Sequence, residues 1–286
     1  MPIDDNLLAK IGRNHASHSK SSFWYQETWS TLEKLILEAH GSDKPDTLYL
    51  AEIGNLAFPY FSMGNIDSVK LFGMDEMIIF SFYYCNRTRY KKVLDLGANI
   101  GLHTLILKLM GFVVESYEPD PIHIEQIKKV LALNKLELSG IHEAAVSSEE
   151  GELEFLRILG NTTGNHLAGS KPGNPYGEVE RFNVKSVGFN ALISQGFDLV
   201  KMDVEGHEAQ LIESLDIAHL ENSDIILEVG SEQNAERIFK IMSKSNIPMY
   251  SQTINWGRVS RLGDMPMSHR DGSLFITKKA SIPWGQ

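Results

Sequence analysis

The chain has 286 residues, a net charge of −10 and 42% hydrophobic residues. This length and apolar content are sufficient to bury the core of one large domain, which excludes a disordered chain. The acidic balance leaves no basic stripe for phosphate backbones, so we expect no nucleic-acid partner. The composition therefore favours a globular protein that acts on a small-molecule substrate.

Two features bear on the cellular compartment. The single cysteine, Cys85, cannot form an intramolecular disulfide, and the first ten residues have neither the basic nor the apolar region of a signal peptide. The closest candidate for a membrane span, residues 77–85, is much shorter than the roughly 18 apolar residues that cross a bilayer. We therefore expect a cytoplasmic protein without a membrane-spanning segment.

Residues 1–89 are predicted to form an extension that precedes the main domain. Aromatic and apolar residues recur at helical spacing between Phe23 and Ile36. Residues 48–69 contain short apolar runs broken by glycine and proline, which is typical of a hairpin, and residues 74–84 predict a buried helix. We expect this helical and hairpin extension to cover the substrate side of the domain at residues 90–286.

The sequence VLDLGANIG at residues 93–101 predicts a strand that ends at Asp95 and turns sharply into a helix. Gly97 and Gly101 supply the positive φ or the close backbone approach that such a turn needs. Their spacing differs from the GxGxxG turn that packs against the pyrophosphate of a dinucleotide. The turn therefore predicts a ligand without a pyrophosphate, and Asn99 within it either caps the helix or contacts that ligand.

A second buried strand, FVVESY, ends in Glu118. An acid about 20 residues beyond the glycine turn is where a ribose diol is held by two hydrogen bonds. A ribose acid without a pyrophosphate turn describes S-adenosylmethionine better than NAD. The predicted cofactor site includes Glu118 and the turn itself, in which Asp95 orders the loop or reaches the cofactor's ammonium group.

The rest of the chain predicts further strands and helices in alternation. Strands are expected at IHEAAVS, FDLVKMD and DIILEV, followed by an antiparallel pair at MYSQTI and SLFITKK. Two alternating segments, ELEFLR and EVERFNVKSV, are typical of another antiparallel pair. Residues 160–177 between them are predicted to be a lid with His166 pointing inward. The predicted fold is α/β, with a mostly parallel sheet of about seven strands and helices on both faces.

Polar residues follow the buried strand FDLVKMD at the sheet edge where ligands of open parallel sheets bind. In the catalytic hypothesis, His207 or Glu205 takes a proton from an acceptor, while Asp203 orients the base or the substrate and also contacts the cofactor. In the alternative, EGHE only caps and charges the first turn of the next helix. A divalent metal is not favoured, because consecutive residues after a strand do not converge on one point.

Three motifs occur in a characteristic order, namely VLDLGANIG, then YEPDP at residues 117–121, then LVKMDVEGHE at residues 199–208. Over residues 90–229 the chain resembles the FkbM family of S-adenosylmethionine-dependent methyltransferases. The resemblance implies a Rossmann-like class I methyltransferase fold, with S-adenosylhomocysteine as the product. It also implies O-methyl transfer to a hydroxyl or carboxyl of a small natural product or saccharide, and contact of Glu143 and Ala144 with the adenine.

Two other function classes stay open at this point. The same fold also serves NAD-dependent oxidoreductases, although the missing second glycine of GxGxxG argues against that class. A noncatalytic binding module on this fold is the second alternative, which Asp203 to Glu208 make less attractive. The sequence does not determine the oligomeric state, and a homo-oligomer is compatible with it.

Overall fold

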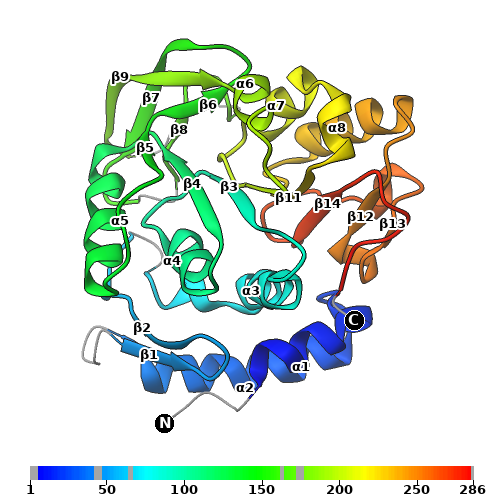
Figure 1. Cartoon of the computed structure of the whole chain (residues 1–286). Helices are drawn as coiled ribbons and strands as arrows, with labels where there is room; N and C mark the ends of the chain where they lie inside the picture. The colour runs from blue at the N-terminus through cyan, green and yellow to red at the C-terminus, as the bar shows by residue number, and fades with distance from the viewer. Residues whose placement is uncertain (1–5, 42–46, 64–66, 162–163, 172–176, 285–286) are drawn as a thin grey trace.

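The computed structural model describes residues 6–41, 47–63, 67–161, 164–171 and 177–284. Within these ranges the strands form one sheet of eight strands, one of four and one of two (Figure 1). The order in the large sheet is β13 (Gly257–Arg258), β12 (Met249–Ser251), β14 (Ser273–Ile276), β11 (Asp224–Glu228), β10 (Leu199–Met202), β3 (Lys92–Leu96), β4 (Val113–Glu118) and β5 (Ile141–Glu143).

The large sheet is mostly parallel, as predicted. The five strands β11, β10, β3, β4 and β5 are parallel, so their carboxyl ends meet at one edge. The pair β12 and β14 is antiparallel, which confirms the terminal pair expected from the sequence. The predicted number of about seven strands is exceeded by one, because the two-residue strand β13 lies within a segment that we expected to be a connection.

Helices cover both faces of this sheet. One hydrophobic cluster contains the buried sides of α3 (Met74–Asn86), α4 (Leu102–Leu109) and α5 (Pro121–Leu133), and a second contains those of α6 (Phe189–Ile193), α7 (Glu208–Ser214) and α8 (Glu232–Lys244). Neighbouring strand residues alternate between the two: Leu199 belongs to the first cluster and Val200 to the second. The strands are therefore apolar on both sides because each side faces a helical layer.

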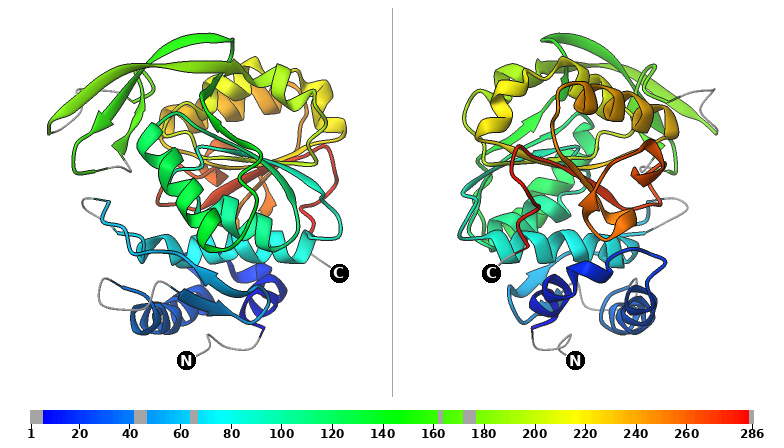
Figure 2. Two further views of the ribbon diagram at one scale, coloured as in Figure 1. Left: turned by 60° about the vertical axis from the view of Figure 1, so that its left-hand side comes forward. Right: turned by 90° about the vertical axis from the view of Figure 1, so that its right-hand side faces the viewer.

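The N-terminal segment packs below α3, on the side away from α6 to α8 (Figures 1 and 2). It consists of α1 (Leu7–Arg13), α2 (Phe23–Ala39) and the antiparallel hairpin of β1 (Thr47–Leu50) and β2 (Gly54–Ala57), which confirms the expected helix and hairpin. Its buried Leu8 shares one hydrophobic cluster with Val93 of the main sheet. The core is thus continuous, and the division into two domains at residue 90 stays a prediction.

A second sheet lies beside the carboxyl ends of β4 and β5 (Figure 2). We call it the side sheet. It has the order β6 (Ala145–Ser147), β9 (Val179–Gly188), β7 (Gly151–Ile158) and β8 (His166–Leu167), and β7 pairs antiparallel with β9 as expected. The expected single strand IHEAAVS is divided at Ala144, where the chain leaves the large sheet as β5 and enters the side sheet as β6.

Short 3₁₀ helices complete the described chain at η1 (His15–Ser17), η2 (Lys70–Phe72), η4 (Ile217–Glu221), η5 (Gln252–Ile254) and η6 (Leu262–Asp264). Across the described residues, no helix has the length and apolar character of a membrane span.

Candidate active site

The turn after β3 packs directly on the end of β10. Gly97 has φ 74°, and a Cβ at this position would lie 1.7 Å from the carbonyl oxygen of Asp203. Gly101 begins α4 with φ 88°, and a Cβ there would lie 2.9 Å from Cγ1 of Ile127. Both glycines are therefore required by backbone conformation and close packing, and Gly97 in addition lines a cavity at this edge of the sheet.

Glu118 ends β4 with its carboxylate held in place by the surrounding backbone. Its Oε2 accepts a hydrogen bond from the N–H of Asn99 at 2.9 Å, and its Oε1 accepts one from the N–H of Asp120 at 3.0 Å. Nδ1 of His123 lies 3.3 Å from the same Oε1. The glycine turn and the start of α5 are thus both tied to one buried carboxylate, which faces the cavity.

Asp95 is fully buried, and its carboxylate contacts other side chains. The Thr104 hydroxyl donates to its Oδ2 at 2.8 Å, and Nζ of Lys201 lies 3.6 Å from its Oδ1. The N–H groups of Gly97 and Ala98 instead donate to the carbonyl of Tyr117. Asp95 therefore does not accept hydrogen bonds from the N–H groups of Gly97 and Ala98, and its contact with the cofactor's ammonium group stays a prediction.

A cavity of about 600 Å³, part of it open to solvent, lies over the ends of β3, β4 and β10. We call it the first cavity. It collects six of the predicted site residues, whereas Asp95, Gly101, Glu143 and His207 are not among the residues that line it. The lining residues are Gly97, Asn99, Tyr117, Glu118, Pro119, His123, Ala144, Ala145, Val146, Phe155, Asn165, His166, Leu167, Asp203, Val204 and Glu205.

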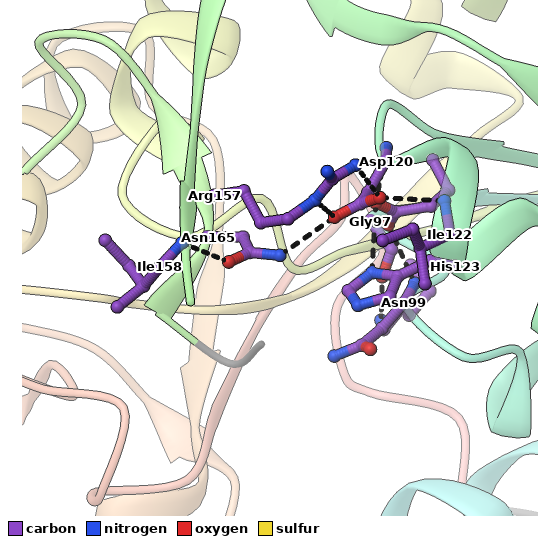
Figure 3. A network of polar contacts seen from close by, with 10 residues as sticks. Gly97, Asn99, Asp120, Ile122, His123, Arg157, Ile158 and Asn165 are labelled. Atoms are coloured by element: carbon purple, nitrogen blue, oxygen red, sulfur yellow. Dashed lines mark hydrogen bonds and ion pairs between the residues drawn. The ribbon is translucent and has the colours of Figure 1, made fainter. Parts of the chain in front are cut away.

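The side sheet supplies the outer wall of the first cavity and is fastened to the start of α5 (Figure 3). Arg157 of β7 donates to both carboxylate oxygens of Asp120, from Nε at 2.9 Å and from Nη2 at 2.6 Å. Nδ2 of Asn165 donates to Asp120 at 3.0 Å, while its Oδ1 accepts from the N–H of Ile158. Side chains of β7 and of the segment before β8 therefore both bind one buried carboxylate at the start of α5.

The lid predicted at residues 160–177 is described in part. His166 lies in β8 and is among the residues that line the first cavity, and its Nδ1 lies 2.7 Å from the carbonyl oxygen of Gly164. Residues 162–163 and 172–176 of this segment lie outside the described residues. The mobility of the segment stays a prediction.

The pair of Arg157 and Asp120 should contribute strongly to stability. Replacing Arg157 with methionine is expected to cost about 3 to 5 kcal/mol of unfolding free energy, because it leaves a buried carboxylate without its main partner. The double variant with Asp120→Asn should recover part of this loss. Urea unfolding of the four proteins measures the coupling, and additive effects of the two substitutions would contradict it.

The same pair predicts a pH dependence. Burial raises the pKa of Asp120, but the hydrogen bonds from Arg157 and the nearby His123 outweigh this and lower it below its usual value. Because the folded-state pKa is the lower one, the stabilisation is present above about pH 4 and is lost as the pH falls through the folded-state pKa. Urea unfolding between about pH 7 and pH 3 should show a smaller acid-induced loss in Asp120→Asn than in the wild type.

Asp203 and Glu205 follow β10 at the boundary of the first cavity. Oδ2 of Asp203 lies 3.7 Å from Nζ of Lys201, and Oε2 of Glu205 lies 2.6 Å from Nζ of Lys171. Burial, followed by the negative charge of Asp203, raises the pKa of Glu205 to about 7. A carboxyl group with this pKa is half ionised near neutral pH, which suits a general base.

His207 begins α7 but has no side-chain capping bond to it. Its Nε2 lies 3.1 Å from the hydroxyl of Ser147, and its Nδ1 lies 3.1 Å from that of Ser170. Burial and the positive charge of Arg237 lower its pKa to about 4, so the ring is neutral at pH 7. Both ring nitrogens thus meet protein hydroxyls, and the catalytic role of His207 stays a prediction that no contact in the structure supports.

The Methyltransferase FkbM domain matches residues 95–252, which include the glycine turn, Glu118 and the end of β10. The chain belongs to this family. Its fold is accordingly the Rossmann-like class I fold of S-adenosylmethionine-dependent methyltransferases, as the strand order and the sequence motifs also indicate.

Solved structures of low sequence identity are also similar. The FkbM methyltransferase of Methylobacillus flagellatus KT has 14% identity and a TM-score of 0.38. The aligned part covers 86% of this chain and 58% of that protein's chain. The chain thus spans little more than half of that protein. An S-adenosylmethionine-dependent methyltransferase from Agrobacterium tumefaciens has 11% identity and a TM-score of 0.38. The aligned part covers 71% of this chain and 60% of that protein's chain. No curated protein matches the chain.

The residues of this FkbM domain fit the S-adenosylmethionine that the family implies. The glycine turn leaves no room for a side chain at Gly97, and the buried Oδ1 of Asn99 has no hydrogen-bond partner among the described residues. A buried polar atom is usually paired in a native protein, so a ligand atom is expected there. For metals, the described residues contain no group of three or more His, Cys, Asp or Glu side chains that is arranged to hold an ion.

Two further cavities adjoin the first, and sequence reasoning missed most of their residues. We call one of them the second cavity. Its lining includes Glu76, His103, Lys201, Asp203 and Glu228. The third cavity connects it to Gly97 and Asn99 and shares Asp203 with both others. The sequence did indicate a special role for Lys201, because a charged residue inside a strand buried on both faces needs partners. No sequence pattern indicates that Glu76 and His103 belong to the site, since only the fold brings α3 to this edge.

Charges in the second cavity are dominated by carboxylates. Nε2 of His103 lies 2.8 Å from Glu76, and the Tyr83 hydroxyl lies 3.0 Å from its Nδ1, so both ring nitrogens are engaged. Burial lowers the pKa of Lys201, but Asp95, Asp203 and Glu76 together raise it. Burial and the charge of Asp203 raise the pKa of Glu228 well above its usual value. The cavity therefore disfavours a further negative charge.

Proposed function

We propose that the protein is an S-adenosylmethionine-dependent O-methyltransferase that acts on a hydroxyl of a small natural product or saccharide. The observation that carries the proposal is the position of Asp203, which lines the first cavity, the second cavity and the third cavity between them. Methyl transfer needs two ligands that meet in line at one point. Asp203 marks such a meeting point.

On the cofactor side, Gly97, Asn99, Glu118 and Ala144 line the chamber, and Asp203 completes it. Bound S-adenosylmethionine would supply an electrophilic methyl group. The task of the protein is then to orient the acceptor oxygen and to remove its proton. Glu143 is exposed and does not line the cavity, so its contact with adenine stays a prediction.

On the acceptor side, we propose that Asp203 or Glu205 takes the proton of the acceptor. Asp203 lines both chambers, whereas Glu205 lines only the first and has a pKa of about 7. The acidic second cavity favours an uncharged hydroxyl over a carboxylate as the acceptor, because like charges repel most strongly where water is excluded. We therefore expect the acceptor to be an alcohol.

A groove beside the N-terminal segment supports the proposal that this segment covers the substrate side. A groove between α2 and α3 is lined by Tyr25 and Trp29, and it shares Asp75, Glu76 and Glu228 with the second cavity. An acceptor larger than the second cavity would extend along this groove. Aromatic and carboxylate side chains together suit a ligand with apolar faces and hydroxyl groups.

Calorimetry and a transfer assay test the proposal. We expect S-adenosylmethionine and S-adenosylhomocysteine to bind and NADH not to bind, which would exclude the oxidoreductase class. With radiolabelled methyl groups, transfer to neutral alcohols should exceed transfer to carboxylates of the same skeleton. Binding of NADH alone would overturn the proposal, and cofactor binding without transfer to any acceptor of a broad metabolite extract would favour the noncatalytic module.

A further inference from the structure

We propose that His123 is a further cofactor-binding residue, whose Nε2 forms a hydrogen bond with a ribose hydroxyl beside Glu118. This inference rests on the proposed function, because it concerns the same S-adenosyl ligand. His123 lies in the first turn of α5 and lines the first cavity, next to the polar network shown in Figure 3.

The unpaired nitrogen is the first observation. His123 is only 2% exposed, and its Nε2 is buried without a hydrogen-bond partner among the described residues. Leaving a buried polar atom unpaired is costly, and native proteins rarely do so without a reason. In a residue that lines a ligand cavity, the missing partner is most simply an atom of the ligand.

The other ring nitrogen defines the chemistry of that partner. Nδ1 lies 3.3 Å from Oε1 of Glu118, and a nitrogen that faces a carboxylate carries the proton. In the neutral ring Nε2 is then an acceptor, and in the charged ring it is a donor. A hydroxyl group satisfies both states, because it donates and accepts, whereas a carbonyl or an ammonium group satisfies only one.

The hydrogen-bonding capacity of Glu118 points to the ribose. Its Oε1 already receives the N–H of Asp120 and faces Nδ1 of His123, while Oε2 receives only the N–H of Asn99. A carboxylate oxygen has two lone pairs, so Oε1 is fully used and Oε2 can accept one more bond. One hydroxyl of a ribose diol therefore pairs with Oε2, and the other needs a second protein partner. Nε2 of His123 supplies it.

Two substitutions separate the two ring nitrogens. His123→Asn places an amide N–H near the position of Nδ1 and removes Nε2, whereas His123→Gln places an amide group near Nε2 and removes Nδ1. We expect His123→Asn to weaken S-adenosylhomocysteine binding about five- to fifteenfold, the equivalent of one hydrogen bond. His123→Gln should retain more of the affinity. The matched control His219→Asn, on η4, should bind as the wild type does.

Deoxy analogues of the ligand provide the decisive measurement. Calorimetry with 2′-deoxy and 3′-deoxy S-adenosylhomocysteine should show that the loss caused by His123→Asn disappears for one of the two analogues, because the hydroxyl that Nε2 contacts is missing. Equal losses for all three ligands, or no loss at all, in a folded variant would overturn the inference. Failure of the wild type to bind S-adenosylhomocysteine would instead overturn the proposed function, so the two failures are distinguishable.

Discussion

Replacing Asp203 with asparagine should lower kcat by about 10² to 10⁴, the usual contribution of a general base. Asparagine has nearly the same shape but cannot take a proton, so the cavities should keep their form. Affinity for S-adenosylhomocysteine should change by less than about tenfold, since Glu118 and the glycine turn remain. The measurement is steady-state turnover with saturating acceptor, together with calorimetry on the same protein.

Companion variants show which group acts as the base. Asp216→Asn removes an exposed carboxylate at the start of η4 and should leave turnover unchanged. If Glu205 is the base instead, Asp203→Asn should keep most of the turnover and Glu205→Gln should remove the rise of activity with pH near 7, because Glu205 has a pKa of about 7. If His207→Asn lowers turnover a hundredfold while neither Asp203→Asn nor Glu205→Gln does, the assignment to the carboxylates is wrong and the histidine hypothesis prevails.

Replacing Glu118 with alanine should weaken binding of S-adenosylmethionine and S-adenosylhomocysteine by about 1 to 3 kcal/mol, or about 5- to 150-fold. The variant loses the charge-assisted bond that Oε2 of Glu118 would accept from the ribose. It also leaves the N–H groups of Asn99 and Asp120 without their acceptor, which loosens the turn that faces the cofactor. Calorimetry measures the affinity, and thermal unfolding measures the accompanying loss of stability.

Two controls accompany this variant. Glu118→Gln keeps one acceptor oxygen and should fall between wild type and Glu118→Ala. Glu125→Ala removes an exposed carboxylate of α5 and should have no effect on binding. Wild-type affinity in a folded Glu118→Ala protein would remove this residue from the site.

The sequence allowed the cofactor half of the site to be predicted because its signals are local. A strand that contains Asp95, a turn with Gly97 and a second strand that ends in Glu118 each occupy a short stretch of chain. The strand order and register then follow from general rules for parallel α/β sheets. Sequence position alone does not give the direction of a side chain, which is why His207 was placed at the correct edge while its contacts were not foreseen.

The missed parts of the site depend on contacts between distant segments. Arg157 and Asp120 are 37 positions apart, and they meet only because the chain leaves one sheet at Ala144 and builds another beside it. Glu76 lines the second cavity because α3 packs on the large sheet. In the chain, α3 precedes every strand of that sheet. No local pattern at these residues indicates such partners.

The N-terminal and C-terminal parts of the described chain meet at an aromatic cluster. Trp24, Trp256 and Trp284 pack around His18, whose ring centroid lies 4.9 Å from that of Trp284, whereas Trp29 of α2 lines the groove beside α3. These are all four tryptophans of the sequence, and none lines the first cavity. Intrinsic tryptophan fluorescence will therefore report how the N-terminal segment is docked against the C-terminal strands, and it will be almost silent to events at the ribose end of the cofactor cavity.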